Sequence, residues 1–339
     1  MSVSLVYMAK PIYGGWVTFT SHLCLKYGCN LYKIGKRTEK NTRDYGYGVK
    51  YQNLDINELI QKENLFITAI DKHYYQYIDK FPDGTKIVIH DPTELKGKQN
   101  PLVPHLHRFN IIVIRETMKQ HLLDQYGIQS CFLPHPFYEY PSINDHHEFY
   151  ALSISRIDFD KHTDFILKAN QNIPDVSKQI QIFGAENRLY VHHKLKQLDF
   201  EKFWKGKYPK TLPLSYENKD LLTNCKFVVD MSIIKGDGGG TQYTFLEAIY
   251  HNCALILHED WVNQGTIFRD KYNCYVIKKG DEGKQIADII NSPLDETYES
   301  IVKQSKELLQ IHEKMEKIKN MNEDNVDDLY LMVISDLNK

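Results

Sequence analysis

Compact apolar runs alternate with segments of helical spacing along most of the chain. In the first part, apolar runs typical of buried strands cover residues 3–8, 30–34, 65–70, 86–90 and 110–114. Apolar positions at helical spacing lie within 17–27, 74–80 and 116–126, and Gly28 and Gly127 mark the expected ends of the first and last of these helices. Strands that alternate with helices predict a parallel sheet in an α/β domain.

The same alternation begins again after a polar stretch. Residues 140–148 contain Pro141, Ser142 and Asn144, which indicates a linker between domains. Beyond it, strand patterns cover 150–154, 179–183, 227–231, 254–258 and 272–277, with helical patterns at 163–170, 189–198, 243–251 and 283–291. We therefore expect an α/β chain with two Rossmann-like domains, at 1–145 and 149–318, and a terminal helix within 319–339 that packs back on the first domain.

Composition and charge exclude several classes of protein. The 339 residues carry a formal net charge of −2, with acidic and basic residues interspersed, so the basic surface that nucleic-acid binding requires is missing. No apolar run reaches the roughly 18–20 residues of a membrane span, and the first residues lack a signal-peptide pattern. The 6 cysteines include no Cys-x-x-Cys pair, so we expect reduced thiols and no zinc site. These features predict a cytoplasmic protein.

A dense group of glycines lies between the strand pattern at 227–231 and the helical pattern at 243–251. The backbone can turn sharply and approach a ligand closely in the run Gly236-Asp237-Gly238-Gly239-Gly240-Thr241. The helix that follows would present its free N–H groups to an anion at the same place. A phosphate group fits this pattern best, and a mobile glycine linker is the other interpretation of the same residues.

Glycines and ionisable residues also follow three other predicted strands. Gly14 and Gly15 occupy the first strand-to-helix turn, and His90 ends a later strand, at an edge where α/β sheets bind ligands. Arg156 and Lys161 follow the first strand of the second domain, and both side chains suit phosphate oxygens. An ordinary turn, a structural histidine and solvated surface cations are the corresponding alternatives.

The order of these motifs resembles that of the retaining GT-B glycosyltransferases of family 4. The pattern Arg156-x-x-x-x-Lys161 resembles the family's Gly-Arg-Leu-x-x-x-Lys-Gly element, with Ser155 in place of the glycine. The further matches are, in chain order, Gly14-Gly15, His90-Asp91, Pro134-His135-Pro136, Gln181-Ile182-Phe183-Gly184, Trp204-Lys205-Gly206 and Phe245-Leu246-Glu247-Ala248. The resemblance covers nearly the whole chain. It extends to glycosyltransferases encoded by large algal viruses, for which the compartment would be the host cytoplasm.

This resemblance implies two domains that face each other across a cleft, with the acceptor on the first and a nucleotide sugar on the second. It implies transfer of a hexose with retention of configuration, with GDP-mannose ranked ahead of UDP-glucose as donor and a glycan or protein-linked acceptor. No metal or other cofactor is expected. By the same resemblance, the catalytic residues are Arg156, Lys161 and His90. The residues implied to bind the donor are Gly14, Gly15, Gly184, Lys205, Asp237, Gly238, Gly239, Gly240, Thr241 and Glu247, the last through the ribose hydroxyls.

One position departs from the family pattern. The first glutamate of the family's Glu-x7-Glu region would fall at Gly239, and Asp237 is the carboxylate that could replace it. The run Asp158-Phe159-Asp160 matches a metal-binding Asp-x-Asp, but it lies between Arg156 and Lys161, whose charges already neutralise phosphate. A nucleotide-sugar-binding protein without activity and a sugar-nucleotide epimerase on the same fold stay open as alternatives. A homodimer also stays open.

Overall fold

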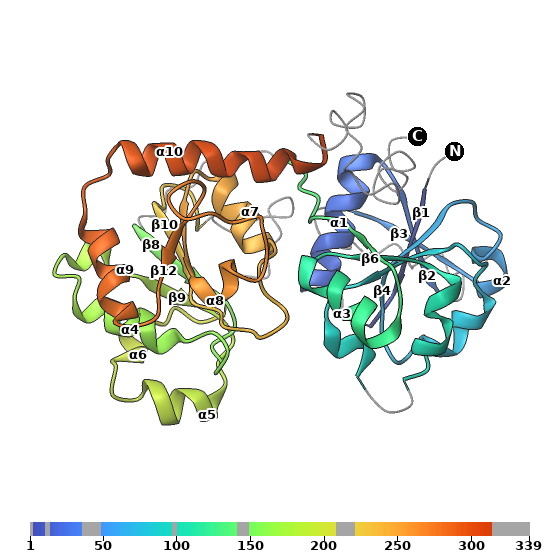
Figure 1. The fold of residues 1–339 in the computed structure, drawn as a ribbon, viewed down its shortest axis with the longest axis horizontal. Coiled ribbons are helices and arrows are strands. Elements are labelled where there is room, and N and C mark those ends of the chain that lie inside the picture. Colours follow the sequence, from blue (N-terminus) through green and yellow to red (C-terminus); the bar gives the residue numbers. More distant parts are fainter. Residues whose placement is uncertain are drawn as a thin grey trace. The chain divides into compact units, whose positions relative to one another are not determined.

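The computed structural model describes residues 3–10, 14–35, 49–96, 100–140, 149–207 and 221–313 (Figure 1). The chain forms two compact units, one made of Met1–Tyr140 with Gln310–Lys339 and the other of Pro141–Leu309. Each unit contains its own parallel β-sheet. The predicted α/β fold with two Rossmann-like domains is therefore confirmed.

The division between the units falls directly after Tyr140, inside the stretch that the sequence predicts as a linker. The chain rejoins the first unit at Gln310. There the imidazole of His312 hydrogen-bonds the carbonyl oxygen of Pro134 at 2.8 Å. The terminal helix expected within 319–339 lies outside the described residues.

The first unit has a seven-stranded sheet in the order β3-β2-β1-β4-β5-β6-β7, and its neighbouring strands run parallel. The strands are β1 (Ser4–Met8), β2 (Asn30–Ile34), β3 (Tyr51–Leu54), β4 (Leu65–Ile70), β5 (Lys86–Ile89), β6 (Asn110–Val113) and β7 (Cys131–Phe132). The strand order reverses between β1 and β4, and this topology binds ligands in the crevice at the carboxyl ends of those strands. The apolar pattern does not predict β3, because Gln52 and Asn53 interrupt it.

Helices α1 (Gly15–Tyr27) and α3 (Glu116–Tyr126) of the first unit end where the sequence predicts. Gly28 and Gly127 follow them with φ of 64° and 65°, a left-handed conformation that glycine adopts without strain. The other helical segments here are α2 (Ile56–Leu59) and the 3-10 turns Tyr75–Lys80, Pro92–Leu95 and Val103–Arg108. The first of these turns is the helical segment predicted over 74–80.

The second unit has a five-stranded parallel sheet in the order β12-β11-β10-β8-β9. The strands are β8 (Ala151–Ile154), β9 (Gln181–Phe183), β10 (Phe227–Asp230), β11 (Ala254–His258) and β12 (Tyr275–Ile277). The order reverses between β8 and β10. The segments that follow these two strands therefore meet at the ligand-binding edge, and they carry the predicted cations and the predicted glycine loop.

Helices cover both faces of the second sheet (Figure 1). They are α4 (Thr163–Gln171), α5 (Arg188–Tyr190), α6 (Phe200–Phe203), α7 (Tyr243–Tyr250), α8 (Glu259–Val262), α9 (Glu282–Asn291) and α10 (Glu296–Ser305), with 3-10 turns at Val176–Lys178 and Lys306–Gln310. A π-helical turn, Val191–Leu195, continues α5, so the helix predicted over 189–198 is only partly α-helical. None of the helices in the described ranges combines the length and the apolar character needed to cross a membrane.

Candidate active site

Lys161 connects the two segments that follow β8 and β10. Its Nζ donates a hydrogen bond to Ser232 Oγ at 2.6 Å, and the same Nζ lies 5.8 Å from the centre of the Trp261 ring. The residue is only 7% exposed. Within the described part of the chain Lys161 forms no ion pair. A buried ammonium group without a carboxylate partner is unfavourable in water-excluded surroundings, and it favours an anion at its side.

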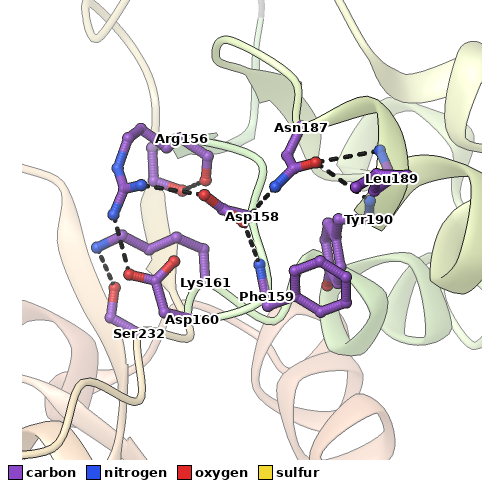
Figure 2. Close-up of polar contacts among 10 residues, drawn as sticks. Arg156, Asp158, Phe159, Asp160, Lys161, Asn187, Leu189, Tyr190 and Ser232 are labelled. Carbon is purple, nitrogen blue, oxygen red and sulfur yellow. Dashed lines mark hydrogen bonds and ion pairs between the residues drawn. The ribbon is translucent and has the colours of Figure 1, made fainter.

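Arg156 lies next to Lys161 with its guanidinium group held by two carboxylates (Figure 2). Its two terminal nitrogens contact Asp158 Oδ2 at 3.1 Å and Asp160 Oδ2 at 2.9 Å. Asp158 is itself fixed, because its Oδ1 accepts hydrogen bonds from Asn187 Nδ2 at 2.9 Å and from its neighbour's backbone amide. The Asp-x-Asp run thus orients Arg156. The side chain is still 62% exposed, so a phosphate group can reach the guanidinium.

A cavity of about 350 Å³ opens beside Arg156 at the carboxyl ends of β8 and β9. Its lining includes Ser155, Gly184, Lys207, Gln242 and Thr244. Gly184 is required there, because a Cβ atom at this position would lie 1.8 Å from the carbonyl oxygen of Ser155. The cavity therefore joins one predicted donor-binding glycine to a predicted catalytic arginine.

Lys205 does not line this cavity. Its backbone amide donates to the carbonyl oxygen of Ile182, and its Nζ lies 3.5 Å from the carbonyl oxygen of Lys202. Lys207, two residues later, contributes the lysine instead. Gly206 lies between them with φ of 91°, and its carbonyl oxygen accepts from the Gly184 amide. The turn that Gly206 allows brings Lys207 to the cavity.

The glycine loop is fixed by the segment that follows α8. Gln264 Oε1 accepts hydrogen bonds from the amides of Gly236 at 2.9 Å and Gly238 at 3.3 Å, and Trp261 Nε1 donates to the Gly240 carbonyl oxygen. Gly239 has φ of 82°, and a Cβ atom there would lie 2.4 Å from the Gly265 nitrogen. These contacts contradict the interpretation as a mobile linker.

The same contacts change what the loop offers to a ligand. The amides of Gly236 and Gly238 are already used by Gln264. Among the described residues, the amides of Gly239 and Gly240 donate no hydrogen bond, and they precede the first turn of α7. These two amides, in the later part of the predicted loop, are therefore available to a ligand, and phosphate binding there stays a prediction.

Asp237 and Thr241 belong to the loop and Glu247 to the helix that follows it. The lining of the cavity includes none of the three. Thr241 is buried, and Glu247 is buried on α7 one turn after Tyr243. Burial, with the nearby Glu247 carboxylate as a smaller cause, raises the pKa of the Tyr243 hydroxyl well above its usual value. Donor binding by these three residues stays a prediction.

In the first unit, Gly14 has φ of 101° and precedes α1, and a Cβ atom added at Gly14 or Gly15 would have no atom of the described residues within 4 Å. Their surroundings leave room for a ligand. His90 is placed differently. It is buried between the rings of Trp16 and Phe19, and its Nε2 hydrogen-bonds the Thr68 carbonyl oxygen at 2.7 Å. Burial lowers the pKa of His90 to about 4, so these contacts fit a neutral, structural histidine.

No protein-family model and no curated protein matches this sequence. Solved structures match in fold. Alr3699/HepE from Anabaena in complex with UDP aligns with a TM-score of 0.63 and 14% identity over 92% of this chain and 95% of that one. A glycosyltransferase from Rickettsia africae ESF-5 aligns with a TM-score of 0.63 and 13% identity over 100% and 99%. The chain has the GT-B glycosyltransferase fold.

An alpha-glucosyltransferase in complex with UDP and a 13-mer DNA containing an HMU base aligns with this GT-B chain at a TM-score of 0.62 and 12% identity, over 91% of this chain and 95% of that one. TM-scores of this size show a common fold, and at such low identities they show nothing more, so roles for single residues have to come from the geometry of this chain.

Several residues that line the cavity or fix the loop were not predicted from the sequence, among them Lys207 and Trp261. Gln242 and Thr244 lie at the start of α7, directly after the glycines, so their position was a usable signal. Gln264 had no such signal, because it is distant in sequence from the amides that it binds. Across the described residues, no group of three or more His, Cys, Asp or Glu side chains is arranged to hold a metal ion. Metal-independent activity stays a prediction.

Proposed function

We propose that this chain transfers a glycosyl group from a nucleoside diphosphate sugar, with the donor diphosphate bound beside Lys161. The observation that carries the proposal is the buried ammonium group of Lys161, which donates to the Ser232 hydroxyl and has no ion-pair partner in the described ranges. Burial of an unpaired ammonium group costs several kcal/mol. A diphosphate at this edge of the sheet would supply the missing negative charge.

Charge development during the reaction supports the same assignment. When the bond between sugar and diphosphate breaks, negative charge builds on the leaving diphosphate. Fixed positive groups aimed at that charge lower the barrier without reorganising during the reaction. Lys161 is fixed by Ser232, and Arg156 is oriented by Asp158 and Asp160. We assign both cations to the leaving group, and we propose that they take the role of a metal ion.

The cavity beside Arg156 is our candidate for the nucleoside part of the donor. It is lined by polar groups of Ser155, Gln242 and Thr244 and by Lys207. Solved structures with this fold hold UDP and UDP-glucose. UDP sugars are therefore the first donors to test, and GDP-mannose, which the sequence resemblance ranks first, is the second. Transfer with retention of configuration rests on that resemblance.

The proposal is tested by offering the purified chain UDP-glucose, UDP-N-acetylglucosamine and GDP-mannose and measuring release of UDP or GDP as the sugar is transferred to water, with magnesium and with EDTA. We expect release from one donor in EDTA and loss of release in Lys161→Ala. The matched control is Lys168→Ala, because Lys168 is an exposed lysine on α4 close in sequence.

Two other results would contradict the proposal. Donor binding without any release of nucleotide diphosphate would favour the nucleotide-sugar-binding protein. Conversion of the donor into a second nucleotide sugar, seen by proton NMR, would favour the epimerase.

A further inference from the structure

The first unit contains a second cavity at the edge where its sheet topology binds ligands. The cavity measures about 580 Å³ and lies at the carboxyl ends of β4 and β5. Trp16, from the first turn of α1, forms part of its wall. Because α1 follows β1, this places the cavity beside the reversal of strand order between β1 and β4.

The carboxylates of this cavity are engaged by the protein's own backbone. Asp71 accepts hydrogen bonds from the amides of Lys10 at 2.7 Å and His73 at 2.9 Å, one on each carboxylate oxygen. Glu94 Oε2 accepts from the amide of His90 at 3.1 Å. These two acidic side chains therefore hold the ends of the strands in place, and part of their negative charge is compensated.

The uncharged polar groups of the cavity are also committed to internal contacts. The Tyr75 hydroxyl and Asn100 Nδ2 both donate to the carbonyl oxygen of Glu94, at 3.4 Å and 2.7 Å. Asn100 Oδ1 accepts from the amide of Leu102. These bonds make the floor of the cavity a fixed structure.

The basic side chains of the cavity have no such partners. Lys72 and Lys96 are exposed and line the cavity, and within the described residues neither forms an ion pair or a hydrogen bond through its side chain. The exposed His73 lines the same cavity. The two ammonium groups are therefore free to meet an anion, while the carboxylates of Asp71 and Glu94 accept backbone hydrogen bonds.

Trp16 adds an aromatic surface beside these two ammonium groups. Its ring lies 5.8 Å from the imidazole ring of His90, which is buried and therefore fixes the indole from behind. The indole is only partly exposed and lines the cavity. Aromatic rings of this kind pack against the apolar face of a sugar or polyol, while nearby cations bind an attached anion.

We propose that this cavity binds the acceptor and selects acceptors that carry an anionic group, with a sugar or polyol on Trp16 and the anion between Lys72 and Lys96. The inference rests on the proposed glycosyl transfer, since it names the class of molecule that receives the sugar. Phosphate and carboxylate satisfy the same chemistry, and the relative affinities of the two anionic probes below rank them.

The test measures direct binding of small probes to the full chain by saturation-transfer NMR and calorimetry without donor. The probes are glucose 6-phosphate, glucuronate and glucose. We expect the two anionic probes to bind and glucose to bind at least tenfold more weakly. The double variant Lys72→Gln/Lys96→Gln should weaken the anionic probes by about tenfold, as for two partly screened ion pairs. Raising the salt concentration should weaken them further.

Lys80→Gln is the matched control, because Lys80 is an exposed lysine on the turn that carries Tyr75 but does not line the cavity. Equal binding of glucose and glucose 6-phosphate would overturn the inference, and so would unchanged affinity in the double variant. Binding of UDP-glucose and GDP-mannose is measured in the same samples. If one of them binds and the anionic probes do not, the acceptor inference fails alone; if the probes bind and neither nucleotide sugar does, the transfer proposal fails alone.

Discussion

Lys161 Nζ and Ser232 Oγ lie 2.6 Å apart, and this hydrogen bond ties the segment after β8 to the segment after β10. The backbone strengthens the connection, because the Ile233 amide donates to the Asp160 carbonyl oxygen at 2.9 Å. The two segments meet where the strand order reverses. A buried cation at that point lowers the stability of the fold, because its desolvation is costly, but it is well placed to bind a diphosphate.

Replacement of Lys161 should therefore separate stability from activity. Lys161→Met removes a buried charge and keeps the aliphatic packing against Trp261. We expect equal or higher resistance to urea and a fall in turnover of roughly 10²–10³-fold, as for loss of one fixed donor to a developing negative charge. Urea denaturation and nucleotide release measure the two effects. A variant that loses stability and activity together would indicate a structural role.

Asp158 is expected to act on donor binding through Arg156. Its carboxylate fixes one guanidinium nitrogen and is fixed in turn by Asn187. Asp158→Asn should raise the KM for the donor by about threefold to tenfold, equivalent to about 0.5–1.5 kcal/mol for ordering a free side chain, and change kcat less. Steady-state kinetics provide the test, with Asp158→Glu as a partial rescue. The control is Asp175→Asn, which alters an exposed turn elsewhere in the same unit. An unchanged KM would remove Asp158 from this role.

An alanine substitution in the glycine loop should destabilise the protein much more than one in the first glycine turn. Gly239→Ala combines a φ of 82° with a Cβ atom 2.4 Å from the Gly265 nitrogen, so we expect a loss of about 3 kcal/mol or more. Gly15 starts a helix, and in Gly15→Ala no atom of the described part of the chain lies within 4 Å of the new methyl group. We expect that variant to keep the stability of the parent. Equal unfolding midpoints for the two variants in urea would contradict the packing described for the loop.

Buried histidines should make the first unit sensitive to mild acid. Burial lowers the pKa of His22 to about 3 and the pKa values of His90 and His312 to about 4, from 6.5. Between pH 6.5 and about 4 the unfolded chain binds protons at these residues that the folded chain does not. The free energy of unfolding is therefore highest above pH 6.5. It falls by about 1.4 kcal/mol per pH unit for each of these residues as the pH decreases toward 4.

Urea unfolding at pH 7.5 and pH 5 measures this effect. His312→Asn should reduce the difference between the two pH values, while His73→Asn, at an exposed position, should leave it unchanged. If His312→Asn shows the same difference in stability between pH 7.5 and pH 5 as the parent chain, the acid sensitivity belongs to other groups.

Much of the fold could be predicted from the sequence, because most strands are short apolar runs that are followed within a few residues by glycine, proline or a charged residue. Strand β3 could not, since Gln52 and Asn53 break its pattern at the edge of the sheet. The segment 189–198 has helical spacing, and spacing alone does not separate an α-helix from the π-helical turn Val191–Leu195.

The candidate site was located from the sequence but its internal contacts were not. Glycines at 236–240 mark the correct strand-to-helix turn, yet Gly238 and Gly239 are required by close packing on Gln264 and Gly265. Such packing depends on the register between distant segments, which a local motif does not contain. Lys205 illustrates the same limit, since the turn at Gly206 decides that Lys207 reaches the cavity.

We propose above that the buried ammonium group of Lys161 binds the diphosphate of the donor. Calorimetric titration of UDP and GDP into the parent chain and Lys161→Met, both in EDTA, measures this interaction. We expect one of the two nucleotides to bind the parent chain without a metal and to bind Lys161→Met at least tenfold more weakly, while Lys168→Met matches the parent. Equal affinity of the parent chain and Lys161→Met for that nucleotide would show that Lys161 does not bind the diphosphate.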